Sequence, residues 1–116
     1  MDRLHYAGDS ILTGTLIAEA VLEYAHALAL AGTSATVVIP TINEDGTHGR
    51  SELLVGPASQ LISDTEDSEY DEVIDGELVA RMRGEAAQLR LHGAHSPTAG
   101  VTTDQPASAP DFDIRS

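Results

Sequence analysis

The chain of 116 residues contains no cysteine, no tryptophan and no lysine, and only one phenylalanine. Without cysteine there are no disulfide bonds, thiolate metal sites or cysteine nucleophiles. Six basic residues against nineteen acidic ones give a net charge of −13. This charge repels both nucleic-acid phosphates and anionic membrane surfaces. We therefore expect no nucleic-acid or membrane partner, whereas a basic protein partner is compatible with the charge.

The sequence also lacks a long uninterrupted apolar run. The first residues show neither the basic nor the apolar region of a signal peptide. The longest apolar stretch, residues 16–31, is interrupted by Glu19, Glu23 and His26. These three polar residues share one narrow line of a predicted helix, which is typical of a solvated face. We predict a cytoplasmic protein with no cofactor and no bound metal.

Composition divides the chain into three parts. Residues 1–63 predict a small α+β domain, in which two β-hairpins form a small antiparallel sheet packed on one long helix. Residues 64–92 predict an acidic linker that continues into an acidic amphipathic helix. Residues 93–116 are rich in proline, serine, threonine and alanine, which predicts a disordered tail.

The first hairpin and the long helix are expected between residues 3 and 31. Residues 3–7 and 10–13 alternate as strands, with Gly8-Asp9 as the predicted turn. Apolar residues at 3–4 spacing predict a helix from Thr15 to Ala31. We expect Thr13 or Thr15 to cap its N-terminus and Gly32 to cap its C-terminus.

The second hairpin is expected from residues 35–42 and 51–55, which flank a loop rich in turn residues. Pro40 cannot donate to a strand ladder, so the first of these strands is predicted to lie at an edge or to end early. Pro57–Ile62 is compatible with a single helical turn. From about Ser68 a helical stripe is expected, and it consists of Tyr70, Ile74, Leu78, Met82, Ala86 and Leu89.

The helix over residues 15–31 carries a second, weakly apolar stripe of Ala18, Leu22, Ala25 and Ala29. A helix with two apolar faces needs cover on both of them. The sheet covers one, and either the C-terminal helix or a second copy of the chain covers the other. Since a domain of this size has a marginal core, we predict a homodimer through this second face.

One motif suggests catalysis. Gly8-Asp9-Ser10 and the Asp45-to-His48 spacing resemble the GDSL-type serine esterases. The resemblance implies Ser10 as nucleophile, His48 as base and Asp45 as the residue that orients the histidine. No Gly-x-Asn-Asp block is present to supply oxyanion donors, and a hairpin turn explains Gly8-Asp9 without chemistry. A small serine hydrolase is thus the alternative function.

The most distinctive feature is an acidic tract without a single base. Its carboxylates are Asp64, Glu66, Asp67, Glu69, Asp71, Glu72, Asp75 and Glu77. The tract lacks the glycine of a calcium-binding EF-hand loop. It is either a solvated segment of like charges or a docking surface for a basic partner. The leading hypothesis is a non-enzymatic, self-associating interaction or regulatory module.

The order of elements resembles a group of small uncharacterised actinobacterial proteins. The shared features are Leu4 and Tyr6 in the first strand, Gly49-Arg50-Ser51 at the start of a later strand, and Pro57-Ala58-Ser59 after it. The resemblance covers residues 1–60. It implies a ββαββ outline and no particular activity.

Overall fold

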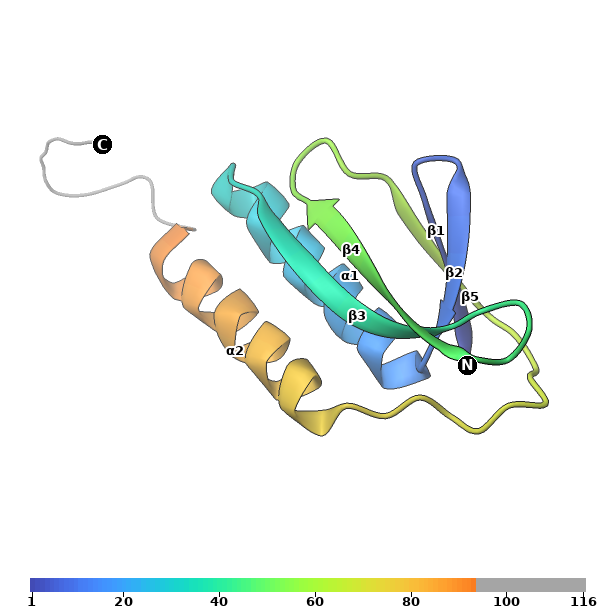
Figure 1. Cartoon of the computed structure of the whole chain (residues 1–116). Helices are drawn as coiled ribbons and strands as arrows, with labels where there is room; N and C mark the ends of the chain where they lie inside the picture. The colour runs from blue at the N-terminus through green and yellow to red at the C-terminus, as the bar shows by residue number, and fades with distance from the viewer. Residues whose placement is uncertain (94–116) are drawn as a thin grey trace, which may run out of the picture. The chain divides into compact units, whose positions relative to one another are not determined.

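The computed structural model describes residues 1–93, so the predicted tail at 94–116 lies outside the described part. The chain forms two units, Met1–Ala86 and a second one that begins at Ala87. The elements are β1 (Asp2–Tyr6), β2 (Asp9–Thr13), α1 (Thr15–Ala31), β3 (Ala35–Ile42), β4 (His48–Val55), β5 (Leu61–Thr65) and α2 (Gly76–Gly93). The strands form one antiparallel sheet in the order β4-β3-β2-β1-β5 (Figure 1). The fold class is therefore α+β.

The first hairpin forms with its turn one residue earlier than predicted. Tyr6 pairs with Asp9, which leaves Ala7 and Gly8 as the two turn residues. Their φ angles are 53° and 82°. Two consecutive positive φ angles are typical of the type I′ turn, whose twist matches that of the flanking strands. Asp9 is thus the first residue of β2 and not part of the turn.

The fifth strand was not expected from the sequence. The prediction of a helical turn at residues 57–62 is wrong, because Leu61–Thr65 pairs antiparallel with β1 and places Ser63 opposite Leu4. The amide of Glu66 donates to the Met1 carbonyl (3.0 Å) and continues this pairing. Without β5, β1 would be an edge strand with unpaired backbone groups. The long-range pairing outweighs the local helical signal of Pro57.

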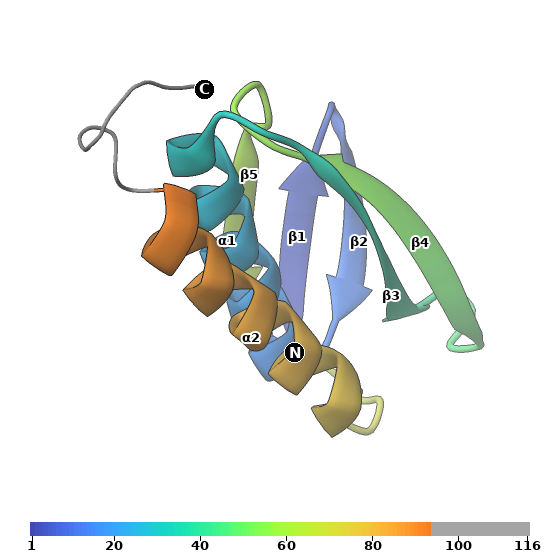
Figure 2. The same cartoon turned by 90° about the vertical axis from the view of Figure 1, so that its left-hand side faces the viewer.

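Helix α1 is confirmed over its predicted range and has buried residues on both sides. Figure 2 shows α1 between the sheet and the first turns of α2. Gly32 ends the helix in the left-handed region, with a φ of 70°, as predicted. The side towards the sheet includes Leu4, Ile17, Val21, Ile39 and Val55, and the buried residues that come from the C-terminal part of the unit are Val73, Leu78, Met82 and Ala86.

The prediction that a helix begins near Ser68 is wrong, since α2 begins at Gly76. The Asp75 carboxylate accepts a hydrogen bond from the Leu78 amide (3.1 Å), which is the geometry of an N-cap. Residues 66–75 form no helix or strand. Ile74, which was assigned to the apolar stripe, is 77% exposed. The cause is that Glu66 and Glu72 of this segment contact Arg3 and the N-terminus of α1.

The two hairpins meet at only one strand pair. Leu12 of β2 pairs with Ile42 of β3, and no other register pair joins these strands. Both outcomes predicted from Pro40 are wrong, since β3 continues to Ile42 and lies between β4 and β2. Pro40 pairs with Arg50 of β4. Its carbonyl accepts from the Thr13 hydroxyl (2.7 Å). Because Pro40 faces β2 where no ladder forms, its missing N–H costs no strand bond.

Candidate functional site

The residues of the alternative hydrolase lie on three different elements. Ser10 is in β2, Asp45 in the loop between β3 and β4, and His48 at the start of β4. The Ser10 hydroxyl accepts from the Arg3 guanidinium (3.4 Å). Among the residues that the structure describes, no hydrogen bond joins Ser10 to His48 or His48 to Asp45. The geometry therefore contains no proton relay from this serine.

Asp45 has a local structural role instead. Its carboxylate accepts from the Thr47 amide (3.0 Å) and from the Thr47 hydroxyl (2.6 Å). These bonds lower the pKa of Asp45, the hydroxyl bond contributing most. The arrangement is a side-chain turn of the kind that aspartate forms with the backbone two residues on. It fixes the loop that connects β3 and β4.

Within the acidic tract, Glu66 is held by a cation from the sheet. Its two carboxylate oxygens accept from Nε and Nη2 of Arg3, at 3.0 and 2.9 Å. This paired geometry is the stronger form of an arginine–carboxylate contact. The hydrogen bond from Arg3 lowers the pKa of Glu66. Glu66 thus fastens the start of the tract to β1.

The Glu72 carboxylate caps the N-terminus of α1. The N-cap residue Gly14 has no side chain, and no side-chain cap is formed there, so the prediction of a Thr13 or Thr15 cap is wrong. The Thr15 amide donates to Oε2 of Glu72 (2.6 Å), and the Met1 α-amino group donates to Oε1 (3.0 Å). A carboxylate at this position is also favoured by the helix dipole. These bonds, led by that from Thr15, lower the pKa of Glu72.

We expect Glu72→Gln to destabilise the domain in a pH-dependent manner. At neutral pH the loss is about 1 kcal/mol, since a cap is lost at a partly exposed site. A depressed folded-state pKa gives stability that is present above the unfolded pKa and lost as pH falls through the folded pKa. The difference between wild type and variant should therefore shrink on acidification below about pH 4.5. Urea midpoints at pH 7 and pH 3 measure it.

The control for this experiment is Asp71→Asn. It removes the same charge from an exposed neighbour, so it reports the relief of general repulsion alone. Equal urea midpoints for the two variants at neutral pH would contradict the capping role of Glu72.

Two further acids of the tract contact the fold. The Asp64 carboxylate lies 3.2 Å from Nε2 of His5, and Asp75 caps α2. The acids that remain exposed without such a contact to the sheet are Asp67, Glu69, Asp71 and Glu77. The eight predicted docking residues thus divide into a set that fastens the tract to the domain and a set that faces solvent.

The exposed acids of the tract lie beside acids from a distant loop. Tyr70 packs on the β3–β4 loop so closely that a Cβ on Gly46 would lie 2.7 Å from its ring. A hollow of about 360 Å³ at this position is lined by Glu44, Asp67 and Glu69, among others. Burial, with added contributions from Glu69 and Asp45, raises the pKa of Tyr70. Carboxylates that are far apart in sequence therefore share one surface, the Tyr70 surface (Glu44, Asp45, Asp67 and Glu69).

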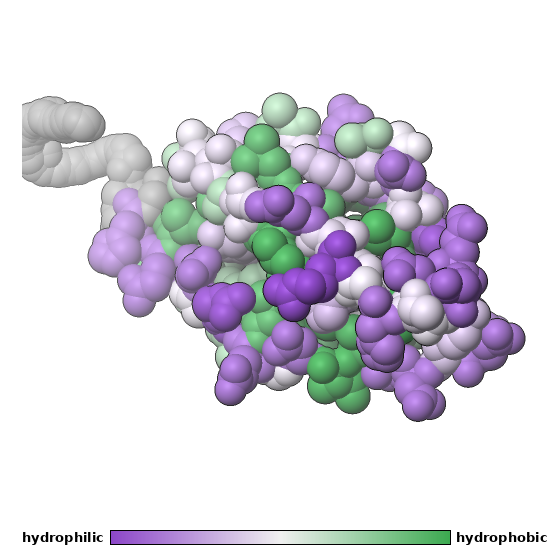
Figure 3. Space-filling model, viewed as in Figure 1, coloured by the Kyte–Doolittle hydropathy of each residue, from purple (hydrophilic) through white to green (hydrophobic). Residues whose placement is uncertain are grey.

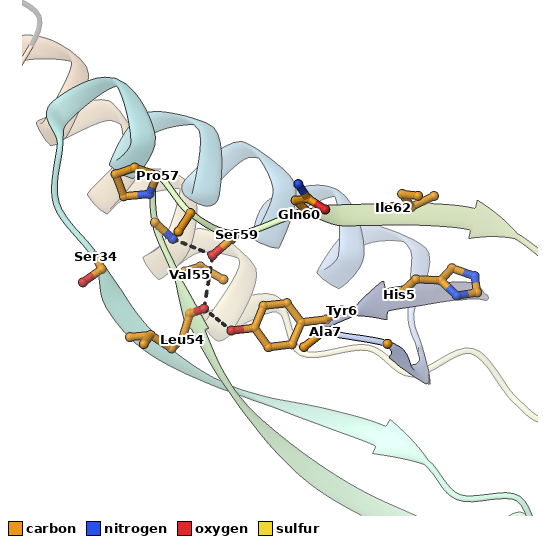
Figure 4. A pocket seen from close by; sticks show the side chains of 13 residues that line it. His5, Tyr6, Ala7, Ser34, Leu54, Val55, Pro57, Ser59, Gln60 and Ile62 are labelled. Atoms are coloured by element: carbon orange, nitrogen blue, oxygen red, sulfur yellow. Dashed lines mark hydrogen bonds between the residues drawn. The ribbon is translucent and has the colours of Figure 1, made fainter.

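A larger hollow, of about 750 Å³, lies between the β1–β2 turn and the β4–β5 connection. Figure 4 shows the Tyr6 ring reaching across to β4. The Tyr6 hydroxyl donates to the Leu54 carbonyl, which also accepts from the Ser59 hydroxyl. The lining includes Leu54 and Ile62, which are 58% and 61% exposed. The hollow is therefore mainly apolar and open to solvent.

A second hollow, of about 300 Å³, shares Tyr6 with the first one. Its lining also includes Asp9 and Ser10 of β2, and Glu52 of β4. Neither His48 nor Asp45 lines it, so the hollow does not assemble the hydrolase residues. We call these two spaces together the β2–β4 hollow.

The first turns of α2 contact α1 at Glu19, Glu23 and Tyr24. Arg83 lies 3.8 Å from Glu19 and 3.5 Å from Glu23. Burial, together with a hydrogen bond to Glu85, raises the pKa of Tyr24 to about 12. These contacts are with the polar line and with Tyr24, and not with the stripe of Ala18, Leu22, Ala25 and Ala29, so the predicted homodimer through that stripe stays a prediction.

Sequence reasoning missed Tyr6, Leu54 and Ser59 as neighbours, because their contact depends on tertiary structure. It also missed the contacts of Glu66 and Glu72, for which the only signal was the absence of a capping side chain at Gly14.

No helix within residues 1–93 is long and apolar enough to cross a membrane. The chain matches no protein-family model, no curated protein and no solved structure.

Proposed function

We propose that this protein is a non-enzymatic interaction module that binds a basic segment of a partner protein through the Tyr70 surface. The observation that carries the proposal is the convergence of the tract with the β3–β4 loop. Glu44, Asp67 and Glu69 line one hollow there, although they come from different parts of the sequence. A rigid group of carboxylates attracts a cationic partner more strongly than a mobile chain of like charges does.

Some acids of the tract bind the rest of the domain and others are exposed, and this difference supports the proposal. Glu66 and Glu72 fasten the segment at both ends, so the acids between them are held in place before any partner arrives. The one cation that lines the hollow, Arg3, already pairs with Glu66. The negative charge of Asp67 and Glu69 is therefore left for a partner.

The test is the binding of a fluorescein-labelled oligo-arginine peptide, measured by fluorescence anisotropy at low and high salt. We expect the double variant Asp67→Asn/Glu69→Gln to weaken binding about tenfold at low salt, because it removes two close charges. Binding by the wild type should weaken steeply as the ionic strength rises.

The matched control is Glu19→Gln/Glu77→Gln, which removes two exposed carboxylates from the helices. It has the same net charge as the test variant. An equal loss of affinity for both variants would show attraction by overall charge, without a located surface, and would contradict the proposal.

A further inference from the structure

The β2–β4 hollow combines features that the Tyr70 surface does not have. Its walls include two strand edges without a strand partner. β2 and β3 pair only at Leu12 and Ile42, so residues 9–11 have no neighbour on the side away from β1. β4 pairs with β3 alone in the described sheet. Unpaired strand edges offer N–H and C=O groups to an incoming extended chain.

The direction of the free groups on β4 can be read from Leu54. Its carbonyl accepts from the hydroxyls of Tyr6 and Ser59, so it points into the hollow and not towards β3. Alternate residues of a strand direct their backbone groups to the same edge. The backbone groups of Glu52 therefore also face this side, where Glu52 lines the hollow.

The side chains around the hollow specify the chemistry of an occupant. Leu54, Ile62 and Tyr6 provide apolar contacts at one end. Asp9 and Glu52 provide two carboxylates at the other end. Neither arginine nor lysine is among the residues that line the two spaces. Figure 3 shows apolar residues separated by polar ones on the visible face of the molecule.

We infer that the β2–β4 hollow binds an extended segment of a partner protein in which apolar residues are followed by basic ones, and that this segment pairs with the free edge of β4. The apolar side chains lie against Leu54 and Ile62, and the basic ones meet Asp9 and Glu52. The inference goes beyond the acidic docking surface, because it uses other residues and adds backbone pairing to charge.

The probe is a short fluorescein-labelled peptide in which a run of valines is followed by a run of arginines. We expect saturable binding in anisotropy titrations with the full chain, and a loss of about tenfold with Leu54→Ser or with Asp9→Asn/Glu52→Gln. The controls are Val38→Ser, an exposed apolar residue of β3 that does not line the hollow, and Asp67→Asn/Glu69→Gln, which removes equal charge elsewhere. Both controls should bind the peptide nearly as wild type does.

Backbone pairing is tested with the same peptide carrying N-methyl groups at alternate residues, in the two complementary patterns. N-methylation removes N–H donors and keeps every side chain, so one of the patterns should lose about tenfold in affinity. Hydrogen exchange of the Glu52 amide should slow when the unmethylated peptide binds. Equal affinity for all three peptides, with unchanged exchange, would overturn the inference.

Two other outcomes also count against it. If Asp67→Asn/Glu69→Gln weakens binding of the valine–arginine peptide as much as Asp9→Asn/Glu52→Gln does, the hollow is not the site. If sedimentation shows self-association that Leu54→Ser abolishes, the occupant is a second copy of this chain. Both surfaces would be supported separately if oligo-arginine lost affinity only for Asp67→Asn/Glu69→Gln and the valine–arginine peptide lost affinity only for the variants of the hollow, Leu54→Ser and Asp9→Asn/Glu52→Gln.

Discussion

A fragment of residues 1–65 is expected not to fold, although it contains every strand and helix α1. The fragment lacks Val73, Leu78 and Met82, which are all buried in the compact unit. Each such side chain contributes about 1.5–3 kcal/mol when it is removed from water. The combined loss of about 5 kcal/mol or more matches the whole stability of many small domains, about 5–15 kcal/mol. Circular dichroism and the dispersion of amide resonances measure the effect.

The reference for this experiment is a fragment of residues 1–93, which keeps the whole compact unit. We expect it to unfold cooperatively on heating, whereas the shorter fragment shows no transition. A cooperative transition of similar midpoint in both fragments would contradict a structural role for residues 66–86. It would also restore the sequence-based boundary at residue 63.

Gly14→Ala is expected to lower the free energy of unfolding by about 2–3 kcal/mol, because the new methyl group overpacks a closed site. A Cβ at this position would lie 1.8 Å from the Val73 carbonyl oxygen and 3.3 Å from Oε2 of Glu72. The first contact is with backbone, which cannot rotate away. The segment at Glu72 and Val73 must therefore move outward, and the α1 cap is lost with it. Urea denaturation at neutral pH measures the change.

The matched control is Gly84→Ala in α2. A Cβ there meets no atom within 4 Å. Alanine in the interior of a helix is more stable than glycine by about 0.5–1 kcal/mol, so this variant should be slightly stabilised. The two glycine substitutions are thus expected to change the free energy of unfolding in opposite directions. This difference distinguishes the close contact at Gly14 from a general effect of alanine. A Gly14→Ala variant as stable as wild type would contradict the contact.

The elements that the sequence predicted well are those with local causes. The 3–4 spacing of apolar residues and the left-handed Gly32 define α1 within its own segment. The first hairpin was also predicted, although its turn lies at Ala7-Gly8 and not at Gly8-Asp9. The strand at residues 35–42 follows from its β-branched residues, and the one predicted at 51–55 is confirmed, although β4 begins earlier, at His48. In each case the physical reason lies within a few residues along the chain.

The elements that it predicted poorly depend on partners far away in sequence. β5 forms because it pairs with β1. The residues around Pro57 indicated a helical turn and not this strand. The late start of α2 follows from Glu66 and Glu72, which are drawn to Arg3 and to the N-terminus of α1. In the candidate site, the acids were recognised from composition alone. Which acids hold the fold together, and which face solvent, could not be decided without the tertiary contacts.

The long-range contacts of the acidic segment affect the rate at which the domain folds. The carboxylate that caps α1 is 57 positions from the amide that it binds, and the partner of Arg3 is 63 positions away. Contacts of such separation slow folding, since a long loop must close first. During synthesis, the N-terminal hairpin and α1 leave the ribosome well before Glu72 is made. The nascent chain therefore exposes one side of its central helix until the last third of the domain has emerged.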